Sequence, residues 1–219
     1  MVNKLFSRLF VVGGREAPSP ASELMAPRAH AMREALGDPV AVYRDDAADH
    51  RVDVHAYGRN FADCDEDDDD GYVLVTSGMS DRPMPIPAGA WGRASPLTEL
   101  IWYVRKPHRE FVGNLRWLAK LANFDNTWFA SGHRIPMPEP PLSFCPFKTF
   151  LLLTPILRLD RGLLASVETG GPPIETLCVH LISEPEYALI KRDGLRRLFD
   201  RLDAAGYPLV FDPHRASLV

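Results

Sequence analysis

The 219-residue sequence contains few cysteines and no apolar run long enough to cross a membrane. Its three cysteines, Cys64, Cys145 and Cys178, are far apart and odd in number. This spacing argues against a disulfide framework and against a CxxC metal site, and it fits a reducing compartment. A transmembrane helix needs ~18 or more apolar residues, and no run approaches that length. Arg8 interrupts the first apolar stretch, so we predict no signal peptide and expect a cytoplasmic protein.

An excess of positive charge and the common catalytic motifs are also missing. The chain has 25 Lys and Arg against 29 Asp and Glu, a formal net charge of −4, which argues against a nucleic-acid partner. There is no Walker loop, GxGxxG or HExxH motif. Gly78-Met79-Ser80 begins like a nucleophile elbow, but Arg82 replaces its last glycine and prolines follow instead of a helix. We therefore expect no cofactor and no metal, and no reaction has positive support.

Two apolar runs, residues 72–76 and 100–104, stand out by their β-branched and aromatic content. Runs of this kind between Gly, Pro, Asp and Ser predict buried strands. The segment between them carries Pro83, Pro85, Pro87 and Pro96, which exclude a helix and resist strand pairing. A long loop between two central strands is often functional.

The remaining patterns predict alternating groups of strands and helices. Helices are expected over residues 23–36, with Pro27 in the first turn, over 109–124, and over 184–205 with a break at Asp193-Gly194. Ser183 and Glu186 fit a capping box. Further strands are expected over 40–43, 52–57, 127–135, 147–156, 174–182 and 209–211. This order predicts an α+β fold with a mixed, largely antiparallel sheet and helices packed on it. We expect one domain over residues 22–219 after a loosely ordered lead-in, residues 1–21.

Residues 63–70 form an acidic run. A calcium loop would need a central Gly and a terminal Glu at EF-hand spacing, and neither is in place. A solvated, self-repelling loop is the favoured interpretation.

Several short segments follow one another in the order and spacing of a known family. They are residues 52–55, 75–81 with 83–87, 99–100, 115–122, 126–128 and 132–136. Together they resemble the suppressor of fused domain, from about residue 40 to the C-terminus. The sequence departs from that pattern at Ile182-Ser183, where the family tends to carry Pro-Leu, and residues 63–70 look like a local insertion.

The resemblance implies a non-enzymatic protein-binding domain. Animal relatives with two domains hold a transcription-factor peptide as an added strand in a cleft between the domains. This chain resembles the single-domain bacterial branch, whose members are thought to include immunity proteins that neutralise toxins. It therefore implies a protein partner such as a toxin domain.

Candidate recognition residues lie in two irregular segments that adjoin expected central strands. They are Gly78, Met79, Ser80, Asp81, Arg82, Met84, Trp91, Gly132, His133 and Arg134. We expect the two segments to lie near each other on one face. Three alternatives stay open: an enzyme with a site at residues 78–81 and Gly132-His133, a structural subunit without a discrete ligand, and signature segments that only hold the fold together. We also expect Gly78 to exclude a Cβ, and Trp117 and Leu118 to belong to the core.

Overall fold

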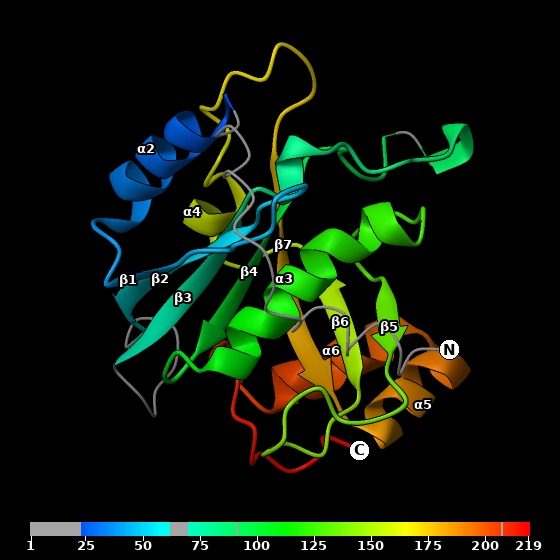
Figure 1. Cartoon of the computed structure of the whole chain (residues 1–219). Coiled ribbons are helices and arrows are strands. Elements are labelled where there is room, and N and C mark those ends of the chain that lie inside the picture. Colours follow the sequence, from blue (N-terminus) through cyan, green and yellow to red (C-terminus); the bar gives the residue numbers. More distant parts are fainter. Residues whose placement is uncertain (1–22, 62–69, 91, 207) are drawn as a thin grey trace.

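The apolar runs of the sequence become the strands of one seven-stranded mixed sheet (Figure 1). The computed structural model describes residues 23–61, 70–90, 92–206 and 208–219. The strand order is β1-β2-β3-β4-β7-β6-β5, and within it only the β4–β7 pair is parallel. The strands are β1 Ala41–Tyr43, β2 Asp53–Asn60, β3 Asp70–Ser77, β4 Thr98–Val104, β5 Arg134–Pro136, β6 Thr149–Leu153 and β7 Glu175–Ile182. The α+β prediction with a largely antiparallel sheet is confirmed.

Side-chain alternation gives the sheet two buried faces. Val54 and Ala56 of β2 point into the larger core cluster, whereas Tyr57 points into the opposite one, as expected from the two-residue period of a strand. All seven residues of β4 are buried. A strand buried along its whole length must be covered on both faces, and the helices provide that cover.

Helices lie on both faces of the sheet (Figure 1). Helix α3 (Arg109–Phe124) covers one face, and its Leu118 is fully buried there while Trp117 is 8% exposed, so both belong to the core as predicted. On the other face, α2 (Met25–Leu36) and α4 (Arg158–Arg161) cover one half, and α5 (Glu184–Asp193) and α6 (Leu195–Ala204) pack over β6 and β7. Two 3-10 turns, η1 (Met79–Asp81) and η2 (Ala88–Ala90), interrupt the proline-rich connection between β3 and β4.

The predicted helix boundaries agree with the local chemistry. Ser183 and Glu186 form the reciprocal capping box at the start of α5. Gly194, at φ 86°, ends α5 and begins α6, which is the predicted break. Pro27 lies in the first turn of α2, as predicted. The buried side of that helix is formed by Arg28, Ala31 and Met32.

Two strand predictions need correction. Residues 127–133 are irregular, with a turn at 131–132, and strand structure begins only at Arg134. Residues 209–211 contribute a single bridge, between Phe211 and Val104. The lead-in, residues 63–69 of the acidic run, and Trp91 lie outside the described residues. Across the described ranges, every helix is too short or too polar to cross a membrane.

Candidate functional site

The loop after β3 is folded around the carboxylate of Glu99, which β4 supplies from the adjacent strand. The Gly78 and Ser80 N–H groups donate to Glu99 at 2.9 and 3.1 Å, and the Ser80 and Thr76 hydroxyls donate at 2.6 Å each. Glu99 has no exposed surface. Backbone N–H groups that converge on one anion offset the cost of burying its charge. The short η1 turn therefore takes its shape from a buried charge.

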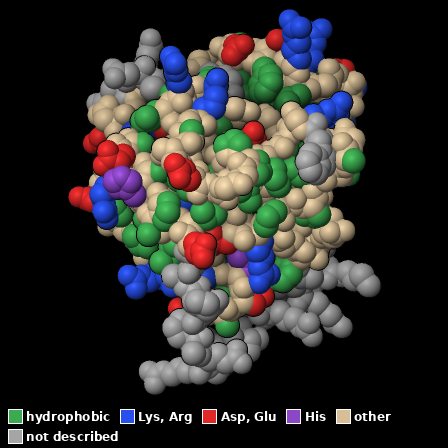
Figure 2. Space-filling view, turned by 90° about the horizontal axis from the view of Figure 1, so that it is seen from above, with side chains coloured by type: hydrophobic (Ala, Val, Ile, Leu, Met, Phe, Trp, Pro, Cys, Tyr) green, Lys and Arg blue, Asp and Glu red, His purple; other side chains and the backbone are tan. Residues whose placement is uncertain are grey.

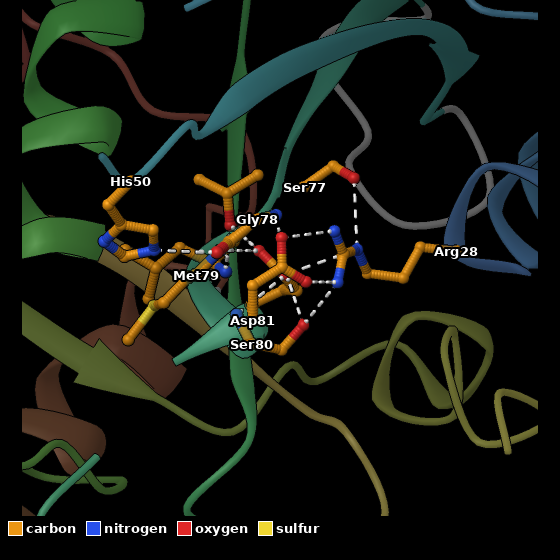
Figure 3. A network of polar contacts seen from close by, with 10 residues as sticks. Arg28, His50, Ser77, Gly78, Met79, Ser80 and Asp81 are labelled. Atoms are coloured by element: carbon orange, nitrogen blue, oxygen red, sulfur yellow. Dashed lines mark hydrogen bonds and ion pairs between the residues drawn. The ribbon is translucent and has the colours of Figure 1, made fainter. Parts of the chain in front are cut away.

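Arg28 of α2 closes this loop from the other side (Figure 3). Its guanidinium forms a two-pronged ion pair with Asp81, one arm of which is 3.1 Å long, and also donates to the hydroxyls of Ser77 and Ser80. Its Nε lies 3.6 Å from a carboxylate oxygen of Glu99. Arg28 is only 1% exposed. One buried cation thus joins α2 to both acidic groups of the loop.

His50 and its neighbours hold the loop on its third side. His50 Nε2 lies 2.8 Å from the Gly78 carbonyl oxygen, which only accepts, so Nε2 carries the proton. Burial lowers the pKa of His50, so the ring is neutral near pH 7. Arg82 donates to the carbonyl of Asp49. A Cβ on Gly78 would lie 2.2 Å from the Arg51 carbonyl oxygen, and Gly78 has φ 133°, so the prediction that this position excludes a Cβ is confirmed.

The first signature segment is therefore largely buried. Met79 and Ser80 are each 1% exposed and Met84 is 3% exposed. Asp81 and Arg82 lie at its surface end. The sequence analysis did not single out Arg28 and His50, because their partners lie far along the chain.

The second signature segment is a bulge at the start of β5. Gly132 N–H donates to the Leu152 carbonyl at 2.7 Å, and Leu152 N–H donates to the His133 carbonyl at 2.9 Å. Gly132 and His133 thus both oppose Leu152, and Gly132 has φ 89°, which is the geometry of a bulge with glycine in its first position. A bulge re-aims the side chains that follow it.

A groove runs beside this bulge, along the outer edge of β5. It has a volume of ≈ 680 Å³. Its lining includes two cations, one carboxylate and three rings, namely Arg134, Lys191, Asp125, Trp128, His133 and Tyr187. The His133 ring lies 4.5 Å from the Trp128 ring, and its Nδ1 lies 3.1 Å from the Trp128 carbonyl oxygen. Burial, with a smaller contribution from Arg134, lowers the pKa of His133, so this groove residue is neutral near pH 7.

The two signature segments do not lie near each other, contrary to the prediction. The strand order places β4, β7 and β6 between β3 and β5. Four strand spacings amount to about 19 Å.

On the face seen in Figure 2, cationic, anionic and apolar side chains of the described residues are interspersed. That face offers neither one sign of charge nor a continuous apolar area.

The polar groups of the first segment are occupied by the fold. Ser80 donates its hydroxyl proton to Glu99 and accepts from Arg28, and it is buried. A nucleophile must reach a substrate, and Ser80 is only 1% exposed. The enzyme alternative also requires the first segment to approach Gly132-His133, which the strand order prevents.

Comparison with known proteins places these features in a family. The family model described as suppressor of fused protein matches residues 49–216. A homologue of suppressor of fused from Neisseria gonorrhoeae has a similar fold, with a TM-score of 0.64 and 15% identity over 91% of this chain and 98% of its own. No protein with a curated description matches this sequence.

Two further solved structures share the fold. A chain of the Sufu–Fu complex has a TM-score of 0.63 and 12% identity, over 92% of this chain and 93% of its own. Drosophila Suppressor of Fused has a TM-score of 0.61 and 12% identity, over 93% of this chain and 52% of its own.

Proposed function

The chain belongs to the suppressor of fused family, and on that premise we propose that it is a non-enzymatic protein-binding domain that takes a segment of its partner as an added strand on β5. The observation that carries this proposal is that, among the residues that the structure describes, β5 has no strand on its outer side and borders a groove. Strand addition needs an unpaired edge for main-chain hydrogen bonds and a nearby recess for side chains. Both are present at β5.

In β5, one residue directs both of its backbone hydrogen-bonding groups away from β6. Residues 133 and 137 hydrogen-bond to the β6 side, through the His133 carbonyl and the Met137 N–H. Because the direction of these groups alternates along an antiparallel strand, Arg134 directs its N–H and C=O outward. Pro136 directs only a C=O outward, since it has no N–H. An incoming strand therefore finds one donor and two acceptors.

Pro136 also limits what the edge can pair with. Proline is tolerated on an edge strand where its missing N–H faces outward, and it discourages unlimited edge-to-edge pairing. The edge therefore favours a short partner segment over a second copy of a long strand. The outer side of β5, which is short and offers more hydrogen-bond acceptors than donors, therefore suits a short peptide-like segment.

A protein partner accords with what is known of a relative, which was solved in a Sufu–Fu complex. Among protein partners, a toxin domain is the one that the resemblance to the bacterial branch implies, and we include an immunity role and a cytoplasmic location in the proposal. Coexpression with a toxin encoded beside this gene tests that role. Growth protection is expected, and continued killing by the toxin would overturn the immunity role.

Strand addition can be tested with peptides selected from a displayed library of random 12-residue sequences. The Arg134→Pro variant removes the outward N–H, and the matched Arg134→Ala variant keeps it. We expect selected peptides to bind Arg134→Pro at least about tenfold more weakly than Arg134→Ala, because a hydrogen bond and an edge position are lost together. Val42→Lys on the β1 edge should leave affinity within twofold.

A spectroscopic measurement covers the case in which Arg134→Pro does not fold. In wild-type protein, amide exchange of Arg134 should slow at least tenfold when a selected peptide is added. Equal affinity of the two Arg134 variants, or unchanged exchange at Arg134, would overturn strand addition on β5.

A further inference from the structure

The groove beside β5 is lined by two exposed cations, Arg134 and Lys191. Arg192, Arg197 and Arg215 each form an ion pair with a carboxylate. Among the described residues, Arg134 and Lys191 have no such carboxylate partner, although both line the groove. Lys191 Nζ lies instead 4.4 Å from the centre of the Tyr187 ring. Within the described ranges, two positive charges beside β5 therefore lack a carboxylate partner, although the sequence has a net negative charge.

The two cations face the same side of the sheet. Arg134 is paired in register with Leu151, which packs into the cluster that includes Ile190 and Tyr187. Side chains opposite each other on neighbouring strands share a face, so Arg134 lies on the α5 side, where Lys191 also lies. Ile135, the next residue of β5, packs against the α3 side together with Trp128.

An added strand would meet these two sides in alternation. Its side chains at every second position would face Arg134 and Lys191, and the intervening ones would face Ile135 and Trp128. Opposite charges across a strand pair are favourable and like charges are unfavourable. The cationic side of the groove therefore favours acidic residues in the added strand, and the apolar side favours apolar residues at the intervening positions.

We infer that the segment taken up on β5 is acidic, with Asp or Glu alternating with apolar or aromatic residues. This inference rests on the proposed strand addition and names the chemistry of the segment. Its acidic side chains pair with Arg134 and Lys191. Its apolar side chains cover Ile135 and Trp128 at the outer edge of the sheet.

The test uses three fluorescein-labelled ten-residue peptides with the same alternating Val and Tyr positions. The intervening positions carry Glu, Gln or Lys, and binding is measured by anisotropy. We expect the Glu peptide to bind at least about tenfold more tightly than the Lys peptide. Each of the two partly exposed charge pairs can raise the affinity by up to about fivefold. Raising the salt concentration should narrow the difference.

Charge-reversal variants assign the preference to the groove. Lys191→Glu should weaken binding of the Glu peptide at least about fivefold and strengthen binding of the Lys peptide. The matched variant is Lys106→Glu, at an exposed position after β4 and three strand positions from β5. It makes the same change of charge and should leave both affinities within twofold.

The outcomes separate this inference from the proposed function. If library-selected peptides depend on the Arg134 N–H but show no enrichment of Asp or Glu at alternate positions, the acidic preference is wrong and strand addition stands. Equal binding of the Glu and Lys peptides would also overturn the preference. If no selected peptide depends on the Arg134 N–H, both proposals fail.

Discussion

At Glu99, five donors from the end of β3 and the following loop converge on one carboxylate. They are the hydroxyls of Thr76 and Ser80 and the N–H groups of residues 78, 79 and 80. A buried charge with this many donors is costly to disturb, because removing one partner leaves others unsatisfied. Substitutions in this loop will therefore change stability before they change binding.

Gly78→Ala tests the tight fit of this loop. The new Cβ would lie 2.2 Å from the Arg51 carbonyl oxygen, and the backbone would keep a positive φ. Steric overlap with a backbone atom and an unfavourable φ together should lower the free energy of unfolding by at least about 2 kcal/mol. Urea denaturation measures the change.

Gly113→Ala is the matched control for that substitution. Gly113 lies inside α3, where a Cβ would have nothing within 4 Å. Alanine should raise the free energy of unfolding there by up to about 1 kcal/mol through its higher helix propensity. Equal effects of the two substitutions would refute the steric argument.

His180 predicts a pH dependence of stability. Burial, with a smaller contribution from Arg215, lowers the pKa of His180 from 6.5 to about 4. Between these values the unfolded chain binds a proton that the folded chain does not, so the free energy of unfolding falls as the pH drops from 6.5 to 4. His180 is half-buried, which keeps the effect below the limit of roughly 3 kcal/mol for full desolvation.

His180→Leu should flatten this part of the stability curve. The measurement is urea denaturation at intervals between pH 7 and pH 4.5. His50, His55 and His133 have pKa values shifted in the same direction, so the variant should reduce the slope without abolishing it. His30→Leu, at an exposed position of α2, should keep the wild-type slope. Parallel curves for wild type and His180→Leu would contradict the prediction.

Individual contacts were the least predictable part of the candidate site. Arg28 reaches Ser77, 49 positions later, and His50 reaches the carbonyl of Gly78, 28 positions later. Local sequence patterns carry no information about such pairs. The conformation of Gly78 could be predicted, because a strand that turns into a proline-rich loop needs an unusual backbone angle.

At the scale of elements, patterns predicted the helices well and the irregular strands poorly. Residues 109–124 form α3 with the predicted bounds, because a wide apolar arc with a polar remainder is a strong helical signal. Residues 127–133 have strand-like composition, yet they are irregular and lead through a turn into the Gly132 bulge. Composition alone did not separate an extended strand from a bulge that leads into one.

Leu118→Ala tests how strongly α3 is held on the sheet. Leu118 is fully buried in the larger core cluster. Truncation should lower the free energy of unfolding by about 2–5 kcal/mol through lost transfer energy and a new cavity. Phe124→Ala, at the end of the same helix, removes a ring that is 58% exposed and should cost less than about 1 kcal/mol. Thermal and urea unfolding measure both, and a small effect of Leu118→Ala would place α3 outside the stabilising core.

At the scale of the whole molecule, strand order determines which segments can cooperate. The sequence predicted the strands around both signature segments, but strand order follows from long-range packing. Strands β4, β7 and β6 lie between the two segments. The first segment is largely buried, and the second borders β5, the last strand of the described sheet. The prediction that the two segments lie near each other was wrong for this reason.

The parallel pairing of β4 with β7 has a consequence for how the chain reaches this structure. Thr98 pairs with Glu175, which lies 77 positions later. Closing so long a loop costs entropy before the pairing returns any stabilisation, and a high contact order slows folding. During synthesis, β4 emerges well before β7 and waits with one edge unpaired. The nascent chain thus passes through a period in which a fully buried strand of the final sheet is open to misassociation, and the speed of translation through residues 105–182 sets how long that exposure lasts.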